Sequence, residues 1–207
     1  MRTPSPLSSV DVYVAPIPKN GQIENVYPPL RNAEILACGS KKVQTEKYYV
    51  WKLLEYAVCR TFDFPFSQID FEKCENGKWK CNRFAFSLSH SKNAVAVALS
   101  KTPVGVDIEW ADDTKIIRLA NKILNEAEKR EYEQTPEAEK TSFLLKKWTQ
   151  KESLFKQSDK VGFFTNIPDT TLEKTWTKAV NVDKERYFLS VAASDVAHVR
   201  LFEIENY

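Results

Sequence analysis

Apolar residues alternate with polar ones in short runs along most of the chain, and this period of two predicts β-strands. The first run holds three alternating valines and is closed by two prolines: Val10, Val12, Val14, Pro16 and Pro18. A loop is predicted at Pro28-Pro29 and a tight turn at Asn76-Gly77. The remaining predicted strands cover residues 69–71, 84–88, 94–99, 104–110, 176–182, 187–193 and 199–204.

Apolar residues spaced three and four apart predict helices between these strands. The first helix has Thr45 as its N-cap and carries an apolar stripe of Val50, Leu53, Leu54, Ala57 and Val58. The second is capped by Asp112 or Asp113 and carries on one face Ile116, Ile117, Ala120, Ile123, Leu124 and Ala127. The third begins with Thr135 as N-cap and Pro136 as first residue, and runs through Leu144, Leu145, Trp148 and Phe155.

Each half of the chain therefore combines a helix with antiparallel strands, which predicts an α+β fold. We expect an N-terminal lobe over residues 1–102 and a C-terminal lobe over residues 103–207. With 207 residues, of which 43% are hydrophobic and 12% aromatic, the chain has ample material for a packed interior. This composition argues against extensive disorder.

Charge and cysteine content narrow the functional classes. The net charge is only +2, so the chain lacks the general signature of a nucleic-acid-binding protein. Four cysteines without a CxxC pair and only two histidines make a zinc site a poor expectation. The first 18 residues lack the apolar core of a signal peptide, and no run is long enough to span a membrane. We expect a cytoplasmic protein with no membrane or nucleic-acid partner, in which buried free thiols are favoured over the alternative of disulfide pairing.

The segment 104–110, VGVDIEW, places two carboxylates inside an otherwise apolar strand. Residues two apart on a strand share a face, so Asp107 and Glu109 point together, away from Val106 and Ile108. Two carboxylates this close repel each other, and a hard divalent cation such as Mg²⁺ relieves the repulsion. The alternative is a strand whose polar face is simply in contact with water.

Two further groups of residues carry candidate chemistry. Trp148, Glu152 and Lys156 are four apart and form one stripe on the third helix. This stripe is either an anchoring tryptophan beside a surface Glu–Lys pair, or the source of a third metal ligand and a phosphate-binding lysine. Ser89 and His90 end the strand 84–88 and suit phosphate binding, although a histidine there is equally explained as a core or surface residue. There is no glycine-rich phosphate loop, so side chains and a metal would have to hold phosphates.

Taken in order, these motifs resemble the 4′-phosphopantetheinyl transferase superfamily, in its monomeric two-lobed form. The matching segments are Asn76-Gly77-Lys78, Phe86-Ser87-Leu88-Ser89-His90-Ser91, Gly105-Val106-Asp107-Ile108-Glu109 and Trp148-Thr149-Gln150-Lys151-Glu152-Ser153 with Lys156. Each segment alone is weakly specific, whereas the ordered set is highly specific. The resemblance implies two pseudo-symmetric lobes, each an antiparallel sheet packed with helices.

The resemblance also implies an activity: transfer of the 4′-phosphopantetheine group of coenzyme A to a serine of an apo acyl or peptidyl carrier protein, with release of 3′,5′-ADP. By motif, Mg²⁺ would be bound by Asp107, Glu109 and Glu152. Glu152 would accept the serine proton and Lys156 would stabilise the departing phosphate. The coenzyme A phosphates would be contacted by Lys47, Lys78, Ser89, His90 and Lys156.

Several points stay open in the sequence. Arg31 and Lys52 compete with Lys47 as N-terminal-lobe contacts for coenzyme A, and each is equally explained as a solvated helix charge. Trp79 stands where relatives often have proline. The segment 115–119 offers a basic and apolar patch for an acidic carrier, unless its isoleucines belong to the core. The rival functions are a non-catalytic module that binds coenzyme A or a carrier, and a Mg²⁺-dependent nuclease.

Overall fold

The computed structural model describes residues 9–158, 160–172 and 174–207. Within these residues the strands form a four-stranded, a three-stranded and a two-stranded sheet, and helices pack against them. The fold is α+β with largely antiparallel sheets, as the sequence pattern predicts. Of the first 18 residues, where no signal peptide is expected, residues 9–18 are described and residues 1–8 lie outside the described part.

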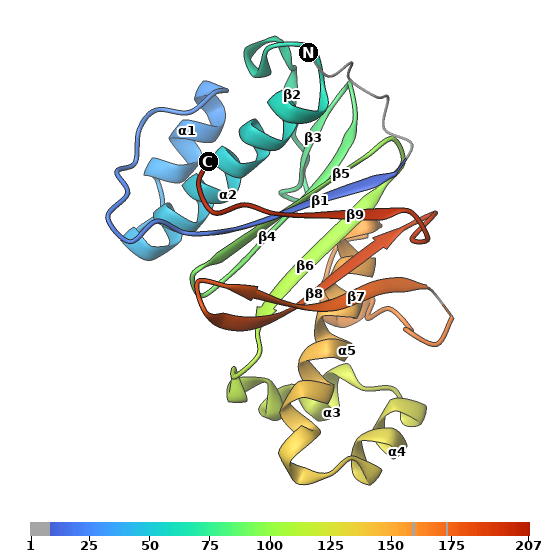
Figure 1. Ribbon diagram of the computed structural model, residues 1–207. Helices are drawn as coiled ribbons and strands as arrows, with labels where there is room; N and C mark the ends of the chain where they lie inside the picture. Colours follow the sequence, from blue (N-terminus) through green and yellow to red (C-terminus); the bar gives the residue numbers. More distant parts are fainter. Residues whose placement is uncertain (1–8, 159, 173) are drawn as a thin grey trace.

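The four-stranded sheet has the order β4-β5-β1-β9. It contains β1 (Val10–Pro16), β4 (Ala85–Ser91), β5 (Ala94–Ser100) and β9 (Val199–Glu203). Neighbours pair antiparallel except β9, which comes from the far end of the chain and pairs parallel with β1 (Figure 1). Helix α2 (Lys41–Thr61) covers one face of this sheet with the buried side chains of its predicted apolar stripe.

The three-stranded sheet has the order β6-β8-β7 and contains β6 (Val104–Trp110), β7 (Thr175–Val182) and β8 (Glu185–Ala193). One of its faces packs on the open face of the four-stranded sheet, where Val106 and Ile108 are fully buried. Helix α5 (Glu137–Gln157) packs on its other face. The order of layers is therefore helix, sheet, sheet, helix, with α2 and α5 on opposite outer sides (Figure 1).

A small hairpin and a short helix complete the N-terminal half. The hairpin pairs β2 (Phe71–Lys73) with β3 (Trp79–Cys81), and Gly77 has a φ of 82° in the predicted turn between them. The loop predicted at Pro28-Pro29 is wrong at its second residue, because Pro29 begins helix α1 (Pro29–Leu36). Proline is well suited to a first helical position, since its missing N–H would have no partner there.

The start of α2 also differs from the prediction. Ser40 is the N-cap residue and the helix begins at Lys41, so Thr45 lies inside the first turns. The Thr45 hydroxyl donates to the Lys41 carbonyl, 2.9 Å away, which is the usual way a helical threonine satisfies its side chain. The polar residues before Tyr48 carry no apolar stripe, which explains why the pattern hides this first stretch.

The second predicted helix is in fact three short segments. Asp113 caps a 3₁₀ helix, Thr114–Leu119, which leads into α3 (Ala120–Ile123). The chain then becomes extended and restarts as α4 (Glu126–Gln134). The restart is encoded by Asn125, which forms a reciprocal capping box with Glu128 and so favours a new helix over a continuous one.

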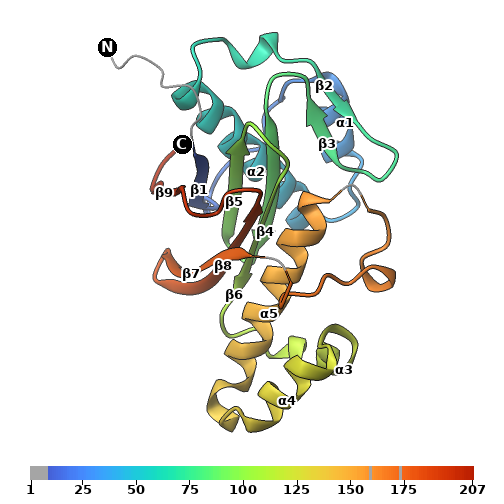
Figure 2. The same ribbon diagram turned by 90° about the vertical axis from the view of Figure 1, so that its right-hand side faces the viewer.

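The third helix begins one residue later than predicted, with Pro136 as the N-cap of α5 and Glu137 as its first residue. Figure 2 shows α3 and α4 packed around the end of α5 that lies farthest from the four-stranded sheet. No helix in the described part of the chain combines the length and apolarity needed to cross a membrane.

Candidate active site

The two large sheets meet where β4 lies alongside β6, and serine side chains fill this seam. β6 pairs with β8 along one edge, so its other edge presents backbone N–H groups that need acceptors. Ser87, Ser89 and Ser91 of β4 supply them, since their hydroxyls accept from the amides of residues 106, 108 and 110 at 3.0, 3.3 and 3.2 Å. We call these three residues the serine ladder.

The carboxylate of Asp107 lies at the centre of the seam and is only 3% exposed. Its Oδ1 accepts from the Ser89 hydroxyl at 2.7 Å and from the Lys156 ammonium at 2.6 Å. Its Oδ2 is buried and has no hydrogen-bond partner among the described residues. A buried carboxylate oxygen without a donor is costly, so this atom is suited to receive a cation.

Glu109 lies two residues further along β6 on the same face, as the strand pattern predicts. Its Oε2 accepts from the Ser91 hydroxyl at 2.7 Å and its Oε1 accepts from the Trp148 indole N–H at 3.2 Å. Burial, together with the neighbouring charge of Asp107, raises the pKa of Glu109 well above its ordinary value. The two carboxylates therefore repel each other, as the sequence indicates.

Helix α5 brings the third acidic residue, Glu152, near Asp107. Gly105 makes this approach possible, because a Cβ atom there would lie 1.8 Å from the Ser153 carbonyl oxygen of α5. Burial and then the repulsion of Asp107 outweigh the attraction of Lys156, and they raise the pKa of Glu152 to about 7. The predicted stripe of Trp148, Glu152 and Lys156 therefore faces the carboxylates of β6 and is not a solvated helix surface.

The donor set at the seam suits Mg²⁺, although the described residues do not form a ready cluster of three or more metal-ligating side chains in this conformation. The seam offers carboxylate oxygens, which are the ligands that Mg²⁺ prefers. The Oδ2 of Asp107 has no donor among the described residues, and burial, with a smaller contribution from the charge of Asp107, raises the pKa values of Glu109 and Glu152. A divalent cation would give this oxygen a partner and would stabilise the charged form of both glutamates.

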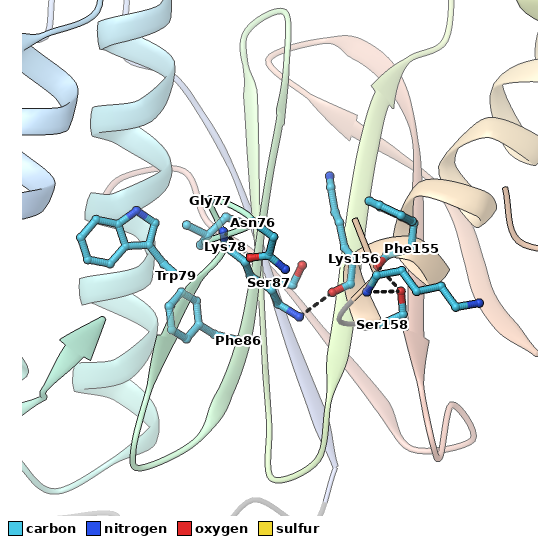
Figure 3. A pocket seen from close by; sticks show the side chains of 11 residues that line it. Asn76, Gly77, Lys78, Trp79, Phe86, Ser87, Phe155, Lys156 and Ser158 are labelled. Atoms are coloured by element: carbon cyan, nitrogen blue, oxygen red, sulfur yellow. Dashed lines mark hydrogen bonds between the residues drawn. The ribbon is translucent and has the colours of Figure 1, made fainter. Parts of the chain in front are cut away.

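A pocket of about 310 Å³ opens beside the seam, and we call it the seam pocket. It is lined by residues 76–79 of the hairpin, 86–88 of β4, and 155, 156, 158 and 160 at the end of α5. In Figure 3, Trp79 and Phe86 lie on one side of the pocket and Phe155 and Lys156 on the other. Its wall is mainly apolar, with lysines from both sides.

Lys78 and His90, two of the predicted phosphate contacts, take up distinct positions. The Lys78 ammonium donates across the seam pocket to the Lys156 carbonyl at 2.7 Å, and so binds the C-terminal end of α5 (Figure 3). The His90 Nδ1 lies 3.6 Å from Glu46 on the side of β4 that faces α2. Burial, and then the positive charge of Lys156, lower the pKa of His90 to about 4.

Lys47 and Arg31 lie in a separate cluster that surrounds Glu34, a residue that the sequence did not single out. The Glu34 carboxylate accepts from Arg31 at 3.0 Å, Lys47 at 2.9 Å and the Trp79 indole at 2.8 Å. Burial alone would raise the pKa of Glu34, but these donors outweigh burial and lower the pKa to about 2. Lys52 is not part of the cluster, since it pairs with Glu55 at 2.6 Å.

The carrier patch expected at residues 115–119 is divided between core and surface. Ile116 is buried, whereas Ile117 is 44% exposed. A second apolar surface, which the sequence did not indicate, follows α5: Phe163 packs on Trp148 and Phe155, and Phe164 is 57% exposed. The signal was weak, because this segment has neither a strand nor a helix period.

Comparisons with known proteins agree with the motifs. Residues 103–201 match the family model described as the 4′-phosphopantetheinyl transferase superfamily (ACPS). The 4′-phosphopantetheinyl transferase gsp of Aneurinibacillus migulanus is 30% identical over 129 residues, which cover 62% of this chain and 54% of that protein. The 4′-phosphopantetheinyl transferase psf-1 of Bacillus pumilus is 28% identical over 111 residues, which cover 52% and 47%.

The chain thus spans about half the length of these curated relatives. The family model covers nearly the whole of the predicted second lobe, including Asp107, Glu109, Glu152 and Lys156. The resemblance that the ordered motifs indicate is therefore confirmed.

Proposed function

We propose that this chain transfers the 4′-phosphopantetheine group of coenzyme A to a serine hydroxyl of an apo acyl or peptidyl carrier protein and releases 3′,5′-ADP. The observation that carries the proposal is the seam itself. Asp107 and Glu109 from β6, and the stripe of Glu152 and Lys156 from α5, meet beside a pocket that is lined by two more of the matching motifs. The resemblance to named transferases supports the same activity.

In this proposal Asp107, Glu109 and Glu152 hold Mg²⁺. The unpartnered Oδ2 of Asp107 and the raised pKa values of the other two carboxyls support this assignment. A bound Mg²⁺ would neutralise charge on the pyrophosphate of coenzyme A. The positive charge of Lys156 adds to this effect: burial opposes it, but Asp107 and then Glu152 raise the pKa of Lys156 and keep it protonated.

The chemistry requires one proton transfer and one displacement. The carrier serine oxygen forms a bond to the phosphorus next to pantetheine, and the bond from that phosphorus to the bridging oxygen breaks, so that 3′,5′-ADP leaves. Glu152 accepts the serine proton; in the metal-free seam burial raises the pKa of this carboxyl to about 7. Lys156 offsets the negative charge of the departing phosphate.

The remaining contacts to coenzyme A are assigned to Lys78 in the wall of the seam pocket and to residues outside that pocket. We place Lys78, Ser89 and His90 near the phosphates of coenzyme A. Ser89 lies beside the proposed metal site, since its hydroxyl donates to Asp107 and accepts from Lys156. Lys47 is placed near the more distant phosphate, together with the cations around Glu34. The expected partner is a carrier protein, and the expected location is the cytoplasm. A monomer is sufficient to form the active site, because both halves of one chain contribute to the seam.

Replacing Glu152 tests these assignments. Glu152→Gln should retain coenzyme A binding, measured by calorimetry, and should lose carrier modification, measured by intact-protein mass spectrometry. Normal turnover by this variant would contradict the role of Glu152 as base. Wild-type protein that binds coenzyme A but modifies no carrier would indicate a non-catalytic binding module.

A further inference from the structure

Glu109 is the only one of the seam carboxylates of β6 whose two oxygens each accept a hydrogen bond from a different element within the described residues. Ser91 of β4 donates to Oε2 at 2.7 Å, and Trp148 of α5 donates to Oε1 at 3.2 Å. Asp107, in contrast, has one oxygen bound by Ser89 and Lys156, and its other oxygen has no partner in the part of the chain that the structure describes. The side chain of Glu109 is thus held from both sides.

The direction of the Ser91 hydrogen bond is fixed by the backbone. The amide of Trp110 can only donate, and it lies 3.2 Å from the Ser91 oxygen, which must therefore accept. The single hydroxyl proton is then left for Glu109. An indole N–H is likewise a donor only, so neither contact can reverse its direction when the carboxylate is charged.

Trp148 is itself held in place by aromatic packing. The ring of Phe163 lies 5.1 Å from the Trp148 ring, edge to face, and Phe163 also packs on Phe155. The indole therefore has little freedom to follow Glu109 if that side chain moves. Without such restraints the repulsion of Asp107 would favour a rotamer of Glu109 that turns away.

We propose that Ser91 and Trp148 are positioning residues that hold the Glu109 carboxylate in the orientation required for metal binding. This inference rests on the proposed function, and it assigns to the last serine of the ladder a task that the first serine lacks. Ser87 accepts from the amide of Val106, and the residue before Val106 is Gly105, which has no side chain for the Ser87 hydroxyl to orient. Ser87 also lines the seam pocket, so it is a matched control for Mg²⁺ binding at saturating coenzyme A and not for transfer activity.

The test measures Mg²⁺ binding rather than turnover. Mg²⁺ is titrated calorimetrically into the full chain saturated with coenzyme A, with no carrier present, and urea unfolding is measured on the same samples. Both Ser87→Ala and Ser91→Ala remove one acceptor for a β6 amide, so both should lose a similar amount of stability. Only Ser91→Ala should weaken Mg²⁺ affinity, by about 10-fold.

Two further variants separate orientation from general damage. Ser91→Thr restores the hydroxyl and should recover Mg²⁺ affinity to within about twofold. Trp148→Phe removes the indole donor, leaves a smaller aromatic ring beside Phe163 and should weaken Mg²⁺ affinity as Ser91→Ala does. Equal Mg²⁺ affinities for Ser87→Ala and Ser91→Ala would overturn the inference. Wild-type protein that binds no Mg²⁺ would overturn the proposed metal site as well, which distinguishes the two failures.

Discussion

At the scale of single residues, the seam is defined by an imbalance of charge. Asp107, Glu109 and Glu152 face one strong cation, Lys156, which contacts Asp107 at 2.6 Å. Burial raises the pKa values of both glutamates, and the Oδ2 of Asp107 has no hydrogen-bond partner among the described residues. A site of this kind favours one additional cation, and this expectation can be tested residue by residue.

Asp107→Asn should abolish most of the transfer activity. The amide keeps the shape of the side chain, but it removes one negative charge from the proposed Mg²⁺ site and weakens the contact with Lys156. We expect kcat to fall by about 100- to 1,000-fold at saturating Mg²⁺. Steady-state carrier modification measures this, and circular dichroism serves as the folding control. Unchanged kcat would exclude Asp107 from the site.

The raised pKa of Glu152 makes stability depend on pH. A carboxyl group whose pKa is higher in the folded than in the unfolded protein stabilises the fold below the unfolded pKa, and this contribution is lost as pH rises through the folded pKa. For Glu152 the window runs from its ordinary value of 4.5 to about 7. Glu152→Gln does not lose this stability as pH rises, because an amide side chain does not ionise.

Without metal, the variant should therefore gain about 1–3 kcal/mol relative to wild type between about pH 5 and about pH 8. Urea unfolding at both pH values measures the difference. Saturating Mg²⁺ should remove the gain, because it compensates the charge of Glu152 in the wild-type protein. A difference that does not change with pH would show that Glu152 is not held in an unfavourable charged state.

At the scale of elements, the site depends on how closely α5 lies on β6. Gly105 leaves no room for a side chain, since a Cβ would meet the backbone of Ser153 at 1.8 Å. Gly105→Ala should therefore push α5 away and destabilise the protein by at least about 1–3 kcal/mol. Gly39→Ala is the control, because no atom of the described residues lies within 4 Å of a Cβ there. Thermal unfolding that shifts equally for both variants would contradict this close packing.

The register of α5 is also fixed by a buried ion pair at Lys151, next to Glu152. The Lys151 ammonium lies 2.9 Å from Glu128 of α4 and 2.9 Å from the carbonyl of Pro168, and both charged side chains are almost fully buried. Glu128 accepts in addition from Thr170. One pair thus ties α4, α5 and the loop around residue 168 together.

Lys151→Met should cost about 3–5 kcal/mol, since it leaves the buried charge of Glu128 with only the more distant ammonium of Lys147, 4.0 Å away. Lys140→Met on the same helix removes an ion pair with the exposed Glu137 and a cation–π contact with Tyr132, and should change stability by less than about 1 kcal/mol. Chemical unfolding curves measure both. Similar small losses would show that the Lys151 pair does not fix the helix.

At the scale of the whole molecule, the sequence predicts well what depends on local periodicity. The strand face shared by Asp107 and Glu109, and the helix stripe of Trp148 and Lys156, follow from periods of two and four residues. The serine ladder could not be predicted, because the pairing of β4 beside β6 joins residues 18 and 19 positions apart across two sheets. The cluster at Glu34 was missed for the same reason, since Trp79 and Glu34 are 45 residues apart.

The division at residue 102 stays a prediction, and one strand crosses it. β9 belongs by sequence to the second half but pairs with β1 in the first, and the Arg200 guanidinium binds both oxygens of Asp11 at 2.7 Å. The two halves are thereby joined at the edge of the sheet opposite the seam.

The central claim is that this seam transfers phosphopantetheine, and intact-protein mass spectrometry of carrier proteins tests it most directly. Several apo carriers are incubated with the full chain, coenzyme A and Mg²⁺, beside a carrier whose acceptor serine is replaced by alanine and a sample in which the metal is chelated. We expect at least one carrier to gain the mass of one phosphopantetheine group, and neither control to gain it. Folded protein that modifies none of the carriers, or that modifies the alanine carrier equally, would contradict the claim.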